Sequence, residues 1–242
     1  MVAVAPEQGV RFPVLRATWS AQTFLHWPYP PERVQALLPR GLTVDRYEGA
    51  AWVSLTPFVM AGARGPGVRA RLPGLATFPE TNLRTCVRGP DGRDGLWFFS
   101  LEVTWPPLLA ARALGVPYRL GRLRVTGDGE RVHYEGTRAG GFPSYLLTVR
   151  PGAPITPSGR DVWLTGRWRA YSRRLGVCWR VPVFHEPWSL RRATVETWEE
   201  TLTAAAGLPP PSGEPVAHFS AGVGRVRLGA PLPRLPRRRP KK

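Results

Sequence analysis

Lysine is almost absent from this chain. Of the 34 basic side chains among the 242 residues, only Lys241 and Lys242 are lysines, and the other 32 are arginines. A catalytic Schiff base needs an amine nucleophile, which a guanidinium group does not supply. Imine chemistry through a lysine side chain is therefore excluded for the whole chain before its last two residues.

Cysteines and long apolar segments are also scarce. Two cysteines, Cys86 and Cys178, are too few for a disulfide framework or a cysteine-based zinc site. No apolar run approaches the roughly 20 residues that cross a bilayer, and the N-terminus lacks the layout of a signal peptide. We therefore expect a cytoplasmic protein with no membrane insertion.

The signature motifs of several enzyme classes are missing. There is no Gly-x-Ser-x-Gly nucleophile elbow, no phosphate-binding loop and no Gly-x-Gly-x-x-Gly dinucleotide motif. The four histidines occur singly rather than at the spacing of a helical zinc site. We therefore expect neither a metal nor an organic cofactor.

Acidic residues are half as numerous as basic ones. The 17 acidic against 34 basic side chains give a net charge of +17, which is typical of proteins that bind nucleic acid. Six of the positive charges lie within residues 234–242, and no groove-reading or base-stacking motif accompanies the others. We expect no specific nucleic acid partner, and association through the arginine-rich surface and tail remains an alternative to small-molecule binding.

Aromatic residues, glycines and prolines are abundant. The 10 Trp, 9 Phe and 6 Tyr indicate a folded core, while 26 Gly and 28 Pro divide the chain into short segments. β-Branched and aromatic residues predict strands at Arg16–Tyr29, Thr43–Tyr47, Ala51–Met60, Thr77–Arg88, Leu96–Trp105, Tyr118–Thr126, Arg131–Arg138, Tyr145–Arg150, Ala170–Arg173, Val177–Phe184 and Val216–Leu228. Helices are predicted at Glu32–Leu38, Pro107–Leu114, Arg160–Trp168 and Thr194–Ala206.

This succession of short strands with few helices predicts a mainly β (α+β) fold. We expect a single curved antiparallel β-barrel or cone of about ten strands, with a few helices on its outside. The barrel should span residues 1–228, and residues 229–242 should form a flexible basic tail rich in Pro and Arg.

The segment Phe78–Val87 carries the most informative pattern. Side chains of a strand alternate between its two faces, so Glu80, Asn82 and Arg84 point the same way. An acid, an amide and a guanidinium in one column could bind a polar ligand inside a barrel or coat a solvated face. The very apolar segment that follows, Leu96–Trp105, favours the first interpretation.

Two further polar groups are candidates for ligand contact. In Leu96–Trp105, the same alternation places Ser100 and Glu102 on one face, so that Glu102 is either a second inward acid or a solvated glutamate. His185 ends a predicted strand, where functional side chains often gather. A single histidine beside a tryptophan, here Trp188, is more often a hydrogen-bonded structural residue.

Several short motifs occur in a characteristic order along the chain. They are Phe24-Leu25-His26-Trp27, Leu38-Pro39-Arg40-Gly41-Leu42, Ala51-Trp52-Val53, Pro57-Phe58, Glu80-x-Asn82-x-Arg84-Thr85, Trp97-Phe98-Phe99-Ser100-Leu101 and His185-x-Pro187-Trp188. Together they resemble the uncharacterised bacterial YqjF-like family (domain of unknown function 2071) from about Trp19 to Val226. That family is grouped with the acetoacetate decarboxylase-like superfamily, so the resemblance implies a β-barrel or cone around a ligand cavity.

The resemblance extends to the decarboxylase segment that carries the Schiff-base lysine. Arg112, Gly115 and Pro117 match that segment, but Tyr118 and Arg119 stand at its two lysine positions. Neither side chain forms an imine, so the Schiff-base decarboxylation of the superfamily is not expected here.

The resemblance still implies a cavity, with Glu80 as an acid that lines it and Arg112 near its mouth. The candidate catalytic residues are Glu80 and Tyr118, and the candidate substrate-binding residues are Asn82, Arg84, Glu102, Arg112, His26 and His185. The alternative is that Glu80 forms a buried ion pair with Arg84 or Arg112 and closes the barrel.

The sequence therefore predicts a β-barrel protein that binds a small organic molecule, either anionic or carbonyl-containing. It could act on this ligand as a lysine-independent lyase, dehydratase or isomerase, with Glu80 as general acid or base. Non-catalytic ligand binding is the alternative, and a homo-oligomer is compatible with the sequence.

Overall fold

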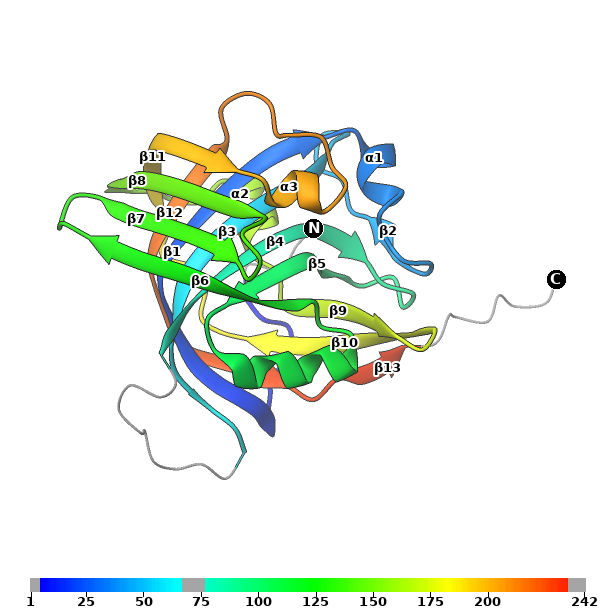
Figure 1. Ribbon diagram of the computed structural model, residues 1–242. Helices are drawn as coiled ribbons and strands as arrows, with labels where there is room; N and C mark the ends of the chain where they lie inside the picture. Colours follow the sequence, from blue (N-terminus) through cyan, green and yellow to red (C-terminus); the bar gives the residue numbers. More distant parts are fainter. Residues whose placement is uncertain (1–4, 67–76, 235–242) are drawn as a thin grey trace, which may run out of the picture.

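The computed structural model describes residues 5–66 and 77–234, and β-strands make up most of it (Figure 1). The strands are β1 (Pro13–Tyr29), β2 (Thr43–Val44), β3 (Ala51–Arg64), β4 (Phe78–Arg88), β5 (Asp94–Val103), β6 (Tyr118–Gly127), β7 (Val132–Arg138), β8 (Ser144–Pro154), β9 (Arg169–Arg174), β10 (Val177–Phe184), β11 (Arg191–Glu200), β12 (Val216–Gly229) and β13 (Leu232–Arg234). The helices are α1 (Pro31–Gln35), α2 (Gly159–Thr165), α3 (Leu202–Ala205) and the 3-10 helix η1 (Pro106–Leu114). None of the described helices is long and apolar enough to cross a membrane.

Nine strands close into a barrel. Their order around it is β5-β6-β7-β8-β11-β12-β1-β3-β4, and the pairing of β4 with β5 completes the circle. Neighbouring strands are antiparallel except β5 and β6, which are parallel and are joined by η1. This crossover agrees with the rule that parallel strands need a longer connection than a hairpin.

Two more strands close a second circle on the other side of the same strands. β9 pairs with β5, and β10 pairs with both β9 and β12, which gives the order β5-β9-β10-β12-β1-β3-β4. The five strands β12, β1, β3, β4 and β5 belong to both circles and are here called the shared wall. Figure 1 shows β6, β7, β8 and β11 on one side of this wall and β9 and β10 on the other.

The shared wall has two faces with different contents. Side chains such as Leu25, Leu55 and Leu83 point into the nine-stranded barrel and form its main apolar core with Tyr134 and Leu147. We call this the packed face. The opposite face, here called the cavity face, looks toward β9 and β10 and carries the polar column of β4. The alternation along each strand therefore separates a core from a candidate site.

The predicted fold class is confirmed, and so are nearly all of the predicted strands. The helix predicted at Thr194–Ala206 is wrong, because β11 occupies residues up to Glu200 and only α3 is helical. A β-bulge between Val195 and Thr197 brings Val195 and Trp198, three residues apart, onto the same buried cluster. This spacing imitates the apolar period of a helix.

The flexible tail predicted from Gly229 onward is also wrong in its first part. Gly229 ends β12, and β13 (Leu232–Arg234) pairs antiparallel with β10. The rest of the predicted tail, residues 235–242, lies outside the described residues. The sheet therefore continues beyond β10 into chain that composition alone would assign to a flexible tail.

Candidate functional site: a buried cavity on the shared wall

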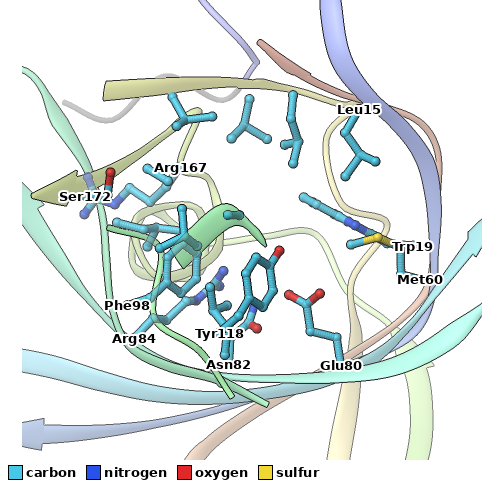
Figure 2. Close-up of a pocket in the computed structure, with 18 of the residues that line it drawn as sticks. Leu15, Trp19, Met60, Glu80, Asn82, Arg84, Phe98, Tyr118, Arg167 and Ser172 are labelled. Atoms are coloured by element: carbon cyan, nitrogen blue, oxygen red, sulfur yellow. The ribbon is translucent and has the colours of Figure 1, made fainter. Parts of the chain in front are cut away.

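A cavity of about 320 Å³ lies between the cavity face and the strands β9 and β10. Its lining comes from β1, β3, β4 and β5 of the shared wall, from η1, from the start of β6, and from β9, β10 and the end of β12. This size is within the range of small-molecule sites in proteins, which begins at about 300 Å³. Figure 2 shows Glu80, Asn82, Arg84 and Tyr118 gathered along one side of it.

Strand β4 places three polar side chains in the cavity by simple alternation. Glu80, Asn82 and Arg84 line it, while Leu83 between them belongs to the apolar core of the packed face. All three polar residues are buried. The predicted column is therefore an inward-facing one, and the solvated alternative does not apply to it.

Arg84 is a buried cation without a counterion. Its Nε and Nη2 atoms have no hydrogen-bond partner, and no carboxylate of the described residues lies within ion-pair distance of it. The guanidinium carbon lies 5.5 Å from the centre of the Phe24 ring. Burial lowers the pKa of Arg84 from 12.5 to about 10, with a further lowering by nearby Arg167, so the side chain stays charged at neutral pH.

Glu80 is held in its protonated form. Burial raises its pKa from 4.5 to about 8, and a hydrogen bond with the Asn82 side chain opposes this only in part. Its Oε2 atom and the Oδ1 atom of Asn82 have no hydrogen-bond partner. Within the described residues no ion pair joins Glu80 to Arg84 or Arg112, so the alternative of a buried pair that closes the barrel is not what the structure contains.

Tyr118 lies beside Glu80 at the start of β6 (Figure 2). Burial and the neighbouring Glu80 carboxyl raise the pKa of its phenol well above 10, so it remains a hydrogen-bond donor at any physiological pH. The turn before it requires Gly115, because that residue has φ +78° and an added Cβ would lie 2.4 Å from the carbonyl oxygen of Arg173. This Gly115 turn ends η1 and leads directly to Tyr118.

His185 also lines the cavity, within a group of tryptophans. Its ring centre lies 5.3 Å from that of Trp19 and 4.9 Å from that of Trp188. Burial lowers the pKa of His185 to about 4, so the imidazole is neutral. Its Nδ1 atom lies 2.6 Å from the Glu186 carbonyl oxygen, which can only accept, so Nδ1 carries the proton and Nε2 is an acceptor.

Glu102 is not in the cavity, contrary to the prediction. A β-bulge in β5 pairs Leu83 with Ser100 but Arg84 with Phe98, so the alternation changes phase. Ser100 and Glu102 consequently share the packed face with Leu83, whereas Phe98 lines the cavity. Glu102 accepts hydrogen bonds of 2.5 and 3.2 Å from the Arg138 guanidinium.

Arg112 and His26 also lie outside the cavity lining. The turn of η1 leaves Arg112 exposed, and its neighbour Ala111 lines the cavity instead. His26 is on the cavity face but beyond the lining residues, where its Nδ1 atom lies 2.6 Å from the Ser54 hydroxyl. The structure therefore brings together five of the eight predicted residues, namely Glu80, Tyr118, Asn82, Arg84 and His185.

Sequence reasoning missed a second buried guanidinium in the cavity lining, that of Arg167. Unlike Arg84, it has carboxylates 3.2 Å away in Asp45 and 3.0 Å away in Asp94, and it stacks 4.4 Å from the Trp163 ring centre. The helix predicted to run to Trp168 ends at Thr165, and Arg167 lies in the irregular segment that follows, where no strand alternation indicates the direction of its side chain. Its charge is balanced within the protein.

Solved structures with a similar architecture include an acetoacetate decarboxylase and an acetoacetate decarboxylase-like enzyme. An acetoacetate decarboxylase-like enzyme from Sphingomonas wittichii RW1 matches with a TM-score of 0.62 at 16% identity, covering 95% of this chain and 96% of that one. The enduracididine biosynthesis enzyme MppR matches with a TM-score of 0.65 at 15% identity, covering 94% and 90%. One MppR structure holds pyruvate. The chain thus has the acetoacetate decarboxylase-like fold.

Sequence comparison gives the family. The model of DUF2071, described as an uncharacterized conserved protein, matches residues 16–224. The uncharacterized protein YqjF of Bacillus subtilis (strain 168) is 32% identical over 213 residues, which is 86% of this chain and 87% of YqjF. The chain belongs to the DUF2071 family, as its motifs predicted.

Proposed function

We propose that the cavity binds a small organic anion with a carbonyl group and that the protein acts on it as a lysine-independent lyase, dehydratase or isomerase. The anion binds to Arg84, and Glu80 and Tyr118 supply hydrogen-bond and proton donors to its oxygen atoms. No lysine precedes Lys241, so this chemistry proceeds without an imine.

The unpaired guanidinium of Arg84 is the observation that carries the proposal. A buried charge without a partner costs several kcal/mol, and proteins rarely keep one that has no use. A carboxylate ligand would accept bidentate hydrogen bonds from Arg84, including from its unpartnered Nη2 atom. Arg167 also has Nε and Nη2 atoms without a hydrogen-bond partner, but Asp45 and Asp94 already balance its charge.

The protonated Glu80 supports an acid role. A carboxylic acid with a pKa of about 8 can donate a proton to a carbonyl oxygen or to a departing hydroxyl group at neutral pH. Tyr118 can stabilise the same oxygen atom through its hydroxyl. The neutral His185 has an acceptor at Nε2. This atom can take the proton that an enolisation or dehydration removes from the carbon next to the carbonyl group. Pyruvate in the similarly folded MppR fits this ligand class.

The test of binding uses α-keto acids and two arginine variants. Isothermal titration calorimetry with pyruvate and α-ketocaproate should show an affinity that falls at least about tenfold in Arg84→Gln. The matched control is Arg112→Gln, whose exposed side chain lies outside the cavity lining and whose loss should leave the affinity unchanged. Equal affinities in wild type and Arg84→Gln would overturn the proposed site.

The test of catalysis follows deuterium entering the carbon next to the keto group in D₂O by NMR. Glu80→Gln should bind the α-keto acid normally and slow the exchange by roughly 10²-fold, the usual contribution of a general acid. Arg84-dependent binding without any exchange in the wild type would overturn the enzyme part and leave a ligand-binding protein.

A further inference from the structure

The cavity has a polar side and an apolar side. In the second circle of strands, β10 and β12 are the strands farthest in order from β4, which carries Glu80 and Arg84. The residues that β10 and β12 contribute are Val181, Val183, Leu228 and Gly229, none of which has a polar side chain. Figure 2 likewise shows Leu15 across the cavity from Glu80 and Asn82.

The volume exceeds what the polar side needs. A cavity of about 320 Å³ is many times the roughly 30 Å³ that one water molecule occupies in the liquid. It therefore has room for a ligand larger than pyruvate. A ligand that only reached the polar groups would leave the surfaces of Val181, Val183 and Leu228 facing empty space or poorly bonded water.

The mouth of the cavity is apolar as well. Val14 and Leu114 line the cavity and are also 40% and 43% exposed, so both belong to the part of the lining that reaches solvent. Leu232, which follows the lining residue Pro231, is 41% exposed. A polar metabolite gains nothing from such an entrance, whereas an apolar group remains in contact with the protein along the whole path.

We propose that the ligand is amphipathic, with one acidic group and an apolar body, such as a medium-chain or aryl-substituted α-keto acid. Its carboxylate lies on Arg84 beside Asn82 and Glu80, and its apolar body lies against Val183 and Leu228. This inference rests on the proposed function for the position of the carboxylate. It adds an apolar body to the anionic carbonyl compound proposed above.

The first experiment measures how affinity depends on chain length. Calorimetry with pyruvate, α-ketobutyrate, α-ketocaproate and α-ketocaprylate should show about fourfold tighter binding for each added methylene until the cavity is full, from about 0.8 kcal/mol per buried methylene. The neutral methyl hexyl ketone should bind at least about tenfold more weakly than α-ketocaprylate, because it leaves Arg84 unpaired.

The second experiment changes the apolar side. Val183→Phe should reduce the affinity for α-ketocaprylate and leave that for pyruvate unchanged, because the larger ring occupies the apolar end. Val177→Phe, on the same strand but outside the cavity lining, is the matched control and should change neither affinity. Val183→Thr keeps the side-chain volume and should flatten the chain-length dependence if Val183→Phe does not fold.

The outcomes separate this inference from the proposed function. Arg84-dependent binding with no gain from pyruvate to α-ketocaprylate overturns the amphipathic ligand and leaves the anion site intact. Binding of α-ketocaprylate that is unchanged in Arg84→Gln, or matched by methyl hexyl ketone, overturns the anion site itself. If the affinity of Val183→Phe still rises with chain length as in the wild type, the apolar body lies elsewhere, and the inference is also overturned.

Discussion

The two faces of the shared wall use the same strands for different purposes. On the packed face, the polar groups of Thr81 and Glu102 are satisfied, by the Tyr145 hydroxyl at 2.6 Å and by Arg138 at 2.5 Å. Among the described residues, the atoms without a partner on that face, Ser100 Oγ and Trp27 Nε1, belong to uncharged side chains. On the cavity face, Glu80, Asn82 and Arg84 each have a buried polar atom without a partner. Satisfied groups stabilise a fold, whereas unsatisfied ones in a cavity are available to a ligand.

Leucine on the packed face should matter most for stability. Leu83→Ala removes a fully buried side chain from the main core, and the expected loss is about 2–5 kcal/mol in the free energy of unfolding. Urea denaturation measures this loss, with Asn82→Ala on the opposite face of β4 as the comparison. A smaller loss for Leu83→Ala than for Asn82→Ala would reverse the assignment of the two faces.

Arginine on the cavity face should have the opposite effect on stability. Arg84→Met replaces an uncompensated buried charge by an apolar side chain of similar length, and we expect about 1–3 kcal/mol of added stability together with loss of anion binding. The same denaturation experiment measures it. Clear destabilisation would mean that Arg84 has a structural partner in solution, and the two faces would then not differ in this respect.

The protonation of Glu80 should make stability depend on pH. The pKa of Glu80 is raised from 4.5 to about 8 in the folded state. Its contribution to the free energy of unfolding is therefore complete below pH 4.5 and is lost as the pH rises to about 8. From pH 5 to pH 8, the melting temperature of the wild type should therefore fall steadily relative to that of Glu80→Gln. Activity that needs the protonated acid should fall above about pH 8. A constant difference would show that Glu80 titrates normally.

The exposed arginine of η1 should have the smallest effect. Arg112→Gln lies on neither face of the shared wall, and we expect a change within about 0.5 kcal/mol in stability. Thermal unfolding measures this change. A large effect would place Arg112 in a contact that the structure does not contain.

Regular strands made part of this site predictable from the sequence. The column of Glu80, Asn82 and Arg84 follows directly from alternation in β4, which has no irregularity between these residues. The face of Glu102 could not be predicted, because the bulge opposite Leu83 changes which side chains of β5 point to which face, and no sequence pattern indicates this bulge. The bulge beside Val195 caused the error in β11 for the same reason.

Other parts of the site depend on tertiary structure alone. Arg167 reaches the cavity from an irregular segment after α2, and only the folded positions of Asp45 and Asp94 distinguish it from Arg84. The apolar side of the cavity depends on the pairing of β10 with β12, two strands that are far apart in the chain. The scarcity of lysine is visible in the sequence, and the structure adds that Arg84 in the cavity lining has no carboxylate partner among the described residues.

A crystal structure with α-ketocaproate would show directly whether Arg84 binds the ligand. We expect the carboxylate within hydrogen-bond distance of the Arg84 guanidinium and the alkyl chain against Val183 and Leu228. A carboxylate bound at Arg167 or at the protein surface, with the cavity free of ligand, would contradict this expectation.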